Sequence, residues 1–285
     1  MARLGLIGAA GFVASRHLAA MATVGSPCIL ACDPHDSVGV LDRHAPDARY
    51  FRDEREFFAD AARARLDAIA ICSPNDLHER HVVAALESGA DALCEKPLAL
   101  DEASLDRLSE AERRTGRRVW TVLQLRVHPA VEAIDRARGR RASVAIDYVT
   151  PRGDWYDRSW KGTPDRSGGL ALNIGVHLFD LATRLFGAPA RVAVRERSAR
   201  TIRVDLALAQ ADVRVLLSVD RALADGAQPS RRFVIDEVTL DLSRLDDSLH
   251  AEIYRRTLSG RGFGIEDARA GVKLARAVQD ARIER

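Results

Sequence analysis

A glycine turn lies directly between the first apolar run of the chain and its first helical pattern. Residues 3–8 are typical of a short buried strand, and residues 12–23 carry apolar side chains at helical spacing. Gly8, Gly11 and Ala14 give the turn the spacing G-x-x-G-x-x-A. Small residues at such a turn let backbone amides approach a pyrophosphate at the helix N-terminus. The turn therefore predicts a dinucleotide site, although a glycine turn without a ligand has the same local pattern.

Strand-like and helical patterns alternate through the rest of this region. Apolar runs at 27–33, 67–74, 90–97 and 119–125 read as strands, and 78–89 and 101–116 read as helices. Alternation of this kind predicts a parallel, doubly wound α/β sheet. Residues 119–125 are read as its sixth strand and the exit of the domain, one strand more than the five strand-like runs of this region. We expect a Rossmann domain over residues 1–123.

A different pattern begins after residue 124. Helices are expected at 129–138, 169–187 and 265–282, and strand-like runs with one polar face at 142–151, 191–198, 201–209, 213–221, 231–237 and 238–243. Several alternating strands predict an open, mainly antiparallel sheet. Residues 124–285 are therefore expected to form an α+β domain that binds substrate and supports a homo-oligomer, a dimer or tetramer.

Composition narrows the class of protein. The chain has 285 residues, enough for two domains, and a formal charge of only +2 despite 29% charged residues. Its basic residues are scattered, so no nucleic-acid partner is predicted. The four cysteines lie in apolar runs without a ligand pattern, which indicates buried thiols and no metal site. The sequence contains no signal peptide and no apolar run long enough for a membrane span, so we expect a cytoplasmic protein.

A second set of residues refines the cofactor prediction. Asp33 follows the second strand, about 25 residues after Gly8, where a carboxylate can accept the ribose hydroxyls and repel a 2′-phosphate. NAD is therefore favoured over NADP. Asn75 can instead be a helix cap, a role compatible with a cofactor contact. The expected cofactor contacts are Gly8, Gly11, Phe12, Val13, Ala14, Asp33, Ser73, Pro74, Asn75, His78, Glu95, Lys96 and Gln124.

The segments that carry the strongest resemblance are GAAGFVA, ACD, SPNDLH, CEKPLAL and a GGxxxNxGxH helix. On these, the chain resembles the glucose–fructose oxidoreductase / inositol dehydrogenase (Gfo/Idh/MocA) family over nearly its whole length. The resemblance implies that Lys96 and His177 flank the reacting hydroxyl and are the catalytic residues. The family often has aspartate where this chain has Asn173, one helical turn before His177. Asparagine cannot act as a base, so His177 is expected to take the hydroxyl proton, with Lys96 tuning that proton.

Longer segments, at 124–129, 148–162, 167–180 and 249–269, resemble the UDP-N-acetylglucosaminuronate 3-dehydrogenases of surface-polysaccharide synthesis. This resemblance implies a nucleotide-sugar substrate whose 3-hydroxyl is oxidised to a ketone. Basic side chains of 148–162 can bind the anionic groups, and its aromatic side chains can flank a sugar or uracil ring. The expected substrate contacts are Lys96, Arg126, Arg152, Trp155, Tyr156, Arg158, Trp160, Lys161, Asn173 and His177.

Other interpretations remain open at this point. The aromatic residues of 148–162 can close the sheet or line a subunit interface, and Arg126 and His128 can make a hydrogen bond at the domain junction. Asp154 and Asp157 add acid to the basic segment, and the chain looks shortened between Asp220 and His250. The alternative functions are a dehydrogenase of a free sugar, cyclitol or sugar acid, and a non-catalytic NAD-binding regulator. Neither the fate of NADH nor the oligomer size follows from the sequence.

Overall fold

The computed structural model describes residues 1–134, 140–224, 229–242 and 247–284. The chain divides into two compact units. The first comprises Met1–Gln124 and Asp246–Ala268, and the second comprises Leu125–Leu245 and Arg269–Arg285. The C-terminal segment that the sequence analysis placed with residues 124–285 is thus shared between the units.

The first unit contains a six-stranded parallel sheet in the order β3-β2-β1-β4-β5-β6. Its strands are β1 (Leu4–Ile7), β2 (Cys28–Cys32), β3 (Arg49–Phe51), β4 (Ala68–Ile71), β5 (Asp91–Cys94) and β6 (Val119–Thr121). The central strands β1 and β4 are buried along their whole length, as expected for a sheet covered on both faces. The predicted doubly wound sheet is confirmed.

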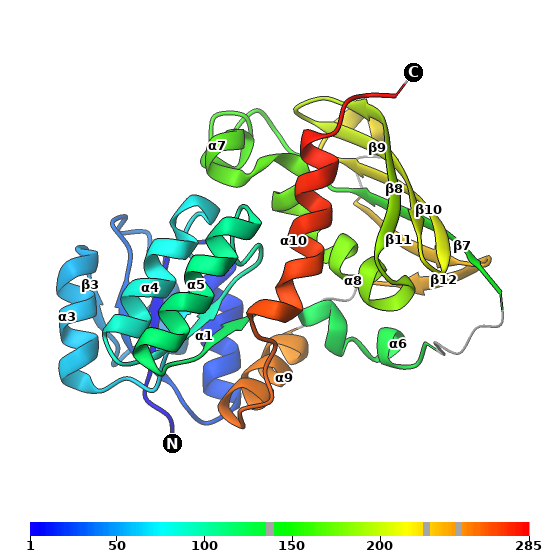
Figure 1. The fold of residues 1–285 in the computed structure, drawn as a ribbon. Coiled ribbons are helices and arrows are strands. Elements are labelled where there is room, and N and C mark those ends of the chain that lie inside the picture. Colours follow the sequence, from blue (N-terminus) through cyan, green and yellow to red (C-terminus); the bar gives the residue numbers. More distant parts are fainter. Residues whose placement is uncertain (135–139, 225–228, 243–246, 285) are drawn as a thin grey trace. The chain divides into compact units, whose positions relative to one another are not determined.

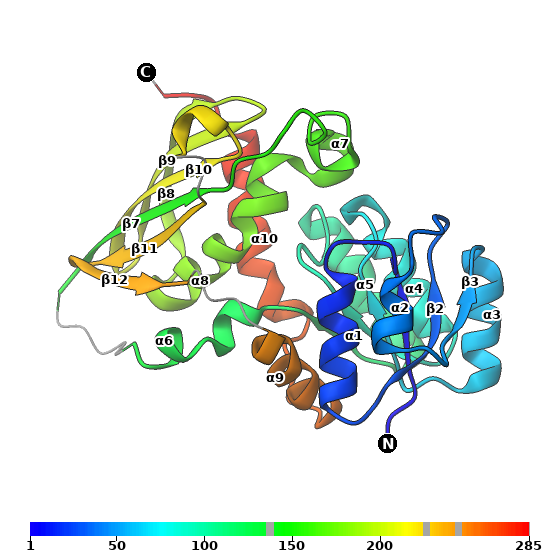
Figure 2. The ribbon, with the colours of Figure 1, turned by 180° about the vertical axis from the view of Figure 1, so that it is seen from behind.

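Helices cover both faces of this sheet. They are α1 (Ala14–Thr23), α2 (Val40–His44), α3 (Glu54–Ala64), α4 (His78–Glu87), α5 (Glu102–Thr115) and α9 (Asp247–Leu258), with the 3₁₀ turn η1 (Asn75–Leu77) before α4. Helices α4 and α5 lie over one face in Figure 1, and α1 lies over the opposite face in Figure 2. Helix α9 packs beside α1 in both views, although more than two hundred residues separate them in the chain.

The second unit contains a six-stranded mixed sheet in the order β12-β11-β7-β10-β9-β8. Its strands are β7 (Ala142–Val149), β8 (Pro189–Arg197), β9 (Thr201–Leu208), β10 (Ala211–Ser218), β11 (Ser230–Ile235) and β12 (Val238–Asp241). Only the β7–β10 pair is parallel among these strand pairs. The prediction of a mainly antiparallel sheet is confirmed.

One face of the second sheet is apolar and covered. Val213, Val215 and Leu217 alternate with more exposed residues along β10. Helices α8 (Val176–Phe186) and α10 (Ile265–Asp280) lie over this sheet on the same side in both views. On the exposed side, ion pairs cross between strands, among them Arg195–Asp205 at 2.8 Å.

The remaining elements of the second unit are short. They are the 3₁₀ turns η2 (Gln124–Val127), which starts at the last residue of the first unit, η3 (Trp160–Gly162) and η5 (Arg221–Leu223), the single-turn helices α6 (Pro129–Glu132) and α7 (Pro164–Ser167), and the π-helical turn η4 (Ala171–Gly175). Helix α6 is shorter than the predicted helix 129–138, of which residues 135–138 lie outside the described residues. None of the described helices is long and apolar enough to span a membrane.

Candidate active site

The glycine turn follows β1 at the carboxyl edge of the parallel sheet. Gly8 has a φ of +94°, and a Cβ atom at this position would lie 2.5 Å from the backbone carbonyl carbon of Cys72. A Cβ atom on Gly11 would lie 3.0 Å from the carbonyl oxygen of Gly8. Position 8 therefore requires glycine both for its backbone conformation and for its space. The turn fits the close backbone approach that a pyrophosphate needs.

The N-terminus of α1 differs from those of two neighbouring helices. Asp53 caps α3 through the N–H groups of Arg55 and Glu56, and Asp101 caps α5 through the N–H of Ser104. Helix α1 has no side-chain cap and no acidic residue in its first turn. Its backbone donors and the positive end of its dipole can therefore bind an anion. Phe12 is exposed beside this helix end, Val13 is half-buried and Ala14 is buried.

Asp33 lies immediately after β2 and is buried. Its Oδ2 accepts the N–H of Ala10 at 3.0 Å, and its Oδ1 accepts the N–H of His35 at 2.9 Å. These hydrogen bonds fix the carboxylate beside the glycine turn. Each carboxylate oxygen retains a lone pair for a further donor such as a ribose hydroxyl. The contact of Asp33 with a ribose stays a prediction.

Ser73, Pro74, Asn75 and His78 follow β4 at the same edge. The His78 ring joins two loops, because its Nδ1 lies 2.7 Å from the Pro97 carbonyl oxygen and its Nε2 lies 3.0 Å from that of Ser73. Burial lowers the pKa of His78, against the effect of these two carbonyls. His78 therefore ties the end of β4 to the end of β5 from inside the unit. No side-chain hydrogen bond caps η1 or α4.

Lys96 follows β5 and is half-buried. Burial lowers the pKa of its ammonium, and the charge of Glu95 partly offsets this effect. The Glu95 carboxylate lies among buried side chains of the first unit rather than at its surface. Gln124, another expected cofactor contact, is buried, and within the described residues its Oε1 makes no hydrogen bond. Such an acceptor is available to a ligand.

The expected helix 169–187 is interrupted in the structure. Residues Ala171–Gly175 form a π-helical turn, and α8 begins at Val176. Asn173, in the π-helical turn, and His177, in α8, are both half-buried, whereas Leu172, Val176 and Leu178 are buried. The two polar side chains therefore share the less buried side of this segment. A π-helical turn is frequent at functional sites because it re-aims side chains out of register with the α-helix.

Arg126 makes a buried ion pair within the second unit. Its Nε donates to Oδ2 of Asp180 at 2.9 Å, and its Nη2 donates to Oδ1 at 2.7 Å. His128 accepts the N–H of Ala130 at 3.2 Å and caps α6. The geometry thus gives Arg126 a structural partner, beside its expected role as a substrate contact.

Tyr156 and Trp155 differ sharply in exposure. Tyr156 is buried, and its hydroxyl accepts a hydrogen bond from Nδ2 of Asn173 at 3.2 Å. Burial raises the pKa of Tyr156, and the hydrogen bond from Asn173 opposes this shift. Trp155 is 51% exposed and meets Tyr156 edge to face at 6.0 Å between ring centroids. Tyr156 therefore contacts both residues, Asn173 through its hydroxyl and Trp155 through its ring.

Cationic side chains lie near two indole rings, the exposed ring of Trp155 and the half-buried ring of Trp160. The Lys161 ammonium lies 5.8 Å from the Trp155 ring centroid and 5.6 Å from that of Trp160. The Arg152 guanidinium lies 5.9 Å from Trp155. Asp157, whose charge complicated the sequence interpretation, forms an ion pair with Arg200. Arg158 and Asp154 are exposed. The segment combines cations with flat apolar rings, as an anionic sugar nucleotide requires.

Family models match both parts of the chain. Residues 2–123 match the oxidoreductase family with an NAD-binding Rossmann fold, and residues 132–227 match the GFO/IDH/MocA C-terminal domain. Among curated relatives, an uncharacterized oxidoreductase of Rhizobium meliloti is 31% identical over 67% of this chain and 58% of its own length. An inositol 2-dehydrogenase of Paracoccus denitrificans is 39% identical over 33% of this chain and 27% of its own. The matched region thus spans less than two thirds of these relatives.

A solved structure matches more completely. The WlbA (WbpB) dehydrogenase of Thermus thermophilus, crystallised with NAD and UDP-GlcNAcA, is 39% identical with a TM-score of 0.94. The match covers 100% of this chain and 96% of that protein. The same dehydrogenase with NAD and α-ketoglutarate gives a TM-score of 0.95. The chain therefore belongs to the Gfo/Idh/MocA family of oxidoreductases, and residues 2–123 are its NAD-binding Rossmann region.

Proposed function

We propose that this protein oxidises a sugar hydroxyl to a ketone with NAD, and that its substrate is UDP-N-acetylglucosaminuronic acid, oxidised at the 3-hydroxyl. The observation that carries the proposal is the 39% identity, across nearly the full length of both chains, with a dehydrogenase crystallised with NAD and UDP-GlcNAcA. The resemblance of residues 148–162 and 249–269 to dehydrogenases of this class points the same way.

The cofactor side of the proposal rests on the carboxyl edge of the parallel sheet. NAD, when bound, accepts a hydride from the carbinol. Gly8, Gly11 and the uncapped start of α1 would hold the pyrophosphate, and Asp33 the ribose. Lys96 follows the strand next to β4 at this edge, where ligands bind in doubly wound sheets.

The reaction also needs a group that removes the hydroxyl proton. We assign this role to His177, because the neighbouring Asn173 has no basic atom. Lys96 would hold the reacting oxygen through its ammonium, whose pKa burial lowers.

The substrate side rests on the cations and indoles of residues 148–162. UDP-N-acetylglucosaminuronic acid carries a diphosphate and a carboxylate, and Arg152, Arg158 and Lys161 are donors suited to such anions. Trp155 and Trp160 present flat apolar surfaces for a sugar or uracil ring.

Two broader properties are part of the same proposal. The four cysteines are buried and unpaired, and burial raises the pKa of Cys28 and Cys32 to about 12. Inert thiols of this kind fit a protein of the reducing cytoplasm. A homo-oligomer is proposed because the open sheet of the second unit has edge strands that another subunit can cover.

The purified full-length chain with NAD tests the substrate directly. UDP-N-acetylglucosaminuronic acid is compared with UDP-N-acetylglucosamine, which lacks the carboxylate, with the free uronic acid, which lacks UDP, and with myo-inositol. Thermal shift reports binding, NADH absorbance reports turnover, and mass spectrometry of borodeuteride-trapped product reports the ketone and its position. A parallel series with α-ketoglutarate detects turnover in which NADH is reoxidised in place.

The proposal predicts stabilisation and a trapped 3-ketone with UDP-N-acetylglucosaminuronic acid only. Equal turnover of the free uronic acid or of myo-inositol would replace it with a free-sugar or cyclitol dehydrogenase. NAD binding without product from any of these compounds would identify a non-catalytic regulator.

A further inference from the structure

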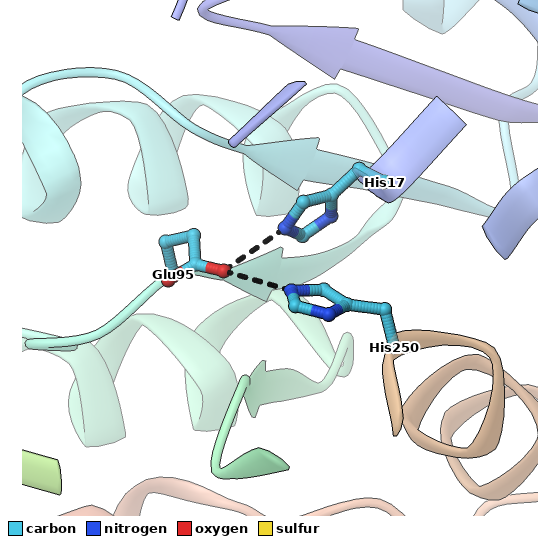
Figure 3. Close-up of side chains that lie close together, drawn as sticks. All are labelled: His17, Glu95 and His250. Atoms are coloured by element: carbon cyan, nitrogen blue, oxygen red, sulfur yellow. Dashed lines mark hydrogen bonds and ion pairs between the residues drawn. The ribbon is translucent and has the colours of Figure 1, made fainter. Parts of the chain in front are cut away.

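Three buried side chains of the first unit meet at one carboxylate oxygen, as Figure 3 shows. Nε2 of His17 lies 3.1 Å from Oε1 of Glu95, and Nε2 of His250 lies 3.6 Å from the same oxygen. The other carboxylate oxygen, Oε2, accepts the backbone N–H of Lys96 at 3.2 Å. Glu95 therefore connects both histidines to the backbone of the lysine.

The three residues come from distant parts of the sequence. His17 lies in α1, Glu95 follows β5, and His250 lies in α9, which joins the first unit after the chain has passed through the second. The two imidazole rings meet edge to face at 5.3 Å between centroids. Because α9 packs against α1, His250 lies next to His17 and Glu95.

The hydrogen bonds define the protonation of His17. Its Nδ1 lies 2.9 Å from the hydroxyl of Tyr254, and burial lowers its pKa, against the hydrogen bond and charge of Glu95. The ring is therefore neutral, with Tyr254 donating to Nδ1 and Nε2–H donating to Glu95. Burial alone would raise the pKa of Glu95, but the hydrogen bond from His17, the facing His250 imidazole and the charge of Lys96 hold it well below its usual value.

The same three side chains also offer ligand atoms within 4.8 Å of one another, a spacing compatible with a metal ion. The Tyr254 hydroxyl argues against this reading. If Nε2 of His17 bound a cation, its Nδ1 would carry the proton and the Tyr254 hydroxyl would lose its acceptor. Within the described residues no other acceptor for that buried hydroxyl is recorded. The hydrogen bond between His17 and Tyr254 therefore favours a metal-free cluster over a metal site.

His250 is the member whose role is least explained by folding alone. It is 2% exposed, and neither ring nitrogen makes a hydrogen bond within the described residues. A buried imidazole without hydrogen bonds destabilises the folded state, because its polar atoms lose their contacts with water. Its Nε2 faces Glu95 across 3.6 Å. The ring is thus placed toward the carboxylate that holds the Lys96 backbone.

We propose that His250 is a positioning residue that acts on Lys96 through Glu95. Helix α9, which carries His250, thereby completes the first unit with a segment from near the C-terminal end of the chain. The Nε2–H of His17 donates to Oε1, and the buried His250 ring confines the same oxygen from 3.6 Å, which together hold Oε2 against the Lys96 N–H. The inference rests on the proposed dehydrogenase function for the role of Lys96. His250 and α9 lie outside the sequence motif that contains Glu95 and Lys96.

The experiment compares His250→Leu, which keeps bulk and removes the polar contact with Glu95, with His250→Gln, whose amide can keep a polar group facing Glu95. Thr257→Val is the matched control, because Thr257 is also buried in α9 and its Oγ1 makes no hydrogen bond to any described residue. Steady-state kinetics give kcat and the KM for NAD. Lysine labelled with carbon-13 at Cε gives a second readout, since the sequence has only Lys96, Lys161 and Lys273.

We expect His250→Leu to lower kcat about tenfold or more with little change in the KM for NAD, because a small misplacement of a catalytic group is costly. The Lys96 signal should move while those of Lys161 and Lys273 stay. His250→Gln should restore most of kcat, and Thr257→Val should resemble the wild type in both readouts.

Wild-type kcat and an unmoved Lys96 signal in His250→Leu would overturn the inference. If that variant fails to fold, His250→Asn replaces it, because its shorter amide cannot reach Glu95 and should be defective where His250→Gln is not. If the wild type turns over none of the sugars, the proposed function fails, and the Lys96 signal alone decides the inference. One zinc per wild-type chain, lost in His250→Gln, would instead assign the cluster to a metal.

Discussion

The guanidinium of Arg126 and the carboxylate of Asp180 form a two-point ion pair whose side chains are 5% and 4% exposed. The pair joins η2, at the start of the second unit, to the middle of α8, three residues after His177. It thereby fixes the helix that carries the proposed base.

Removing one partner of this ion pair should destabilise the second unit. Asp180→Ala leaves a buried guanidinium without its carboxylate, which costs about 3–5 kcal/mol. Asp205→Ala removes an exposed partner of Arg195 in the same unit and should cost far less, because water and salt screen such a pair. Urea unfolding of both variants measures the difference, and equal losses would contradict the structural role of Arg126.

Gly8 should be far less replaceable than Gly25, although both have positive φ. At Gly25 a Cβ atom meets nothing within 4 Å, so Gly25→Ala pays only backbone strain of about 1–2 kcal/mol. Gly8→Ala adds a clash with the Cys72 backbone in the turn proposed to hold the pyrophosphate. Calorimetric titration with NAD should show lost affinity in Gly8→Ala and wild-type affinity in Gly25→Ala.

Asp33 should determine the choice between NAD and NADP. The wild type should prefer NAD at least tenfold, because a buried carboxylate repels a 2′-phosphate and accepts the ribose hydroxyls. Asp33→Asn should reduce this preference by about tenfold. Asp36→Asn, at an exposed carboxylate nearby, is the control and should change neither affinity. A wild-type preference for NADP would exclude the assigned role of Asp33.

Acid should destabilise the first unit through its buried histidines. Burial lowers the pKa of His17, His78 and His81 below the ordinary value of 6.5. The unfolded chain therefore takes up protons first, so stability is complete above about pH 6.5 and falls as the pH drops toward the folded-state pKa values. Tm measured from pH 7.5 to 5 should fall less steeply in His81→Gln, and should keep its slope in His35→Gln, a change at an exposed residue. A flat wild-type profile would contradict these directions.

Much of the fold follows from local pattern. The buried runs around β1 and β4 are continuously apolar, and the glycine turn and Asp33 stand at fixed positions relative to them. Strand β3 was missed because its three residues, Arg49–Phe51, are too few and too exposed to show a period. It lies at the sheet edge, where pairing with β2 rather than burial defines it.

The candidate site was predicted less completely, for reasons of tertiary structure. The motifs identify Lys96, His177 and Asn173, but no periodicity distinguishes the π-helical turn before α8 from an α-helix. The partner of Arg126 lies 54 residues away, so charge pattern alone left its role open.

The cluster of His17, Glu95 and His250 was not predicted. His17 and His250 are isolated histidines in their helices, and nothing in the local sequence pattern predicts that α9 packs in the first unit. The shortening expected between Asp220 and His250 stays a prediction, and residues 225–228 and 243–246 of this stretch lie outside the described residues.

Hydride transfer from the sugar to NAD tests the central claim most directly. UDP-N-acetylglucosaminuronic acid deuterated at carbon 3 is mixed with enzyme and NAD, and deuterium in the reduced cofactor is measured by mass spectrometry in a single turnover. The wild type should yield deuterated NADH, and His177→Ala should slow its formation by about 10²–10⁴-fold while binding NAD normally. His44→Ala, in α2, is the control. Absence of deuterium transfer in the wild type, or wild-type rates in His177→Ala, would contradict the account.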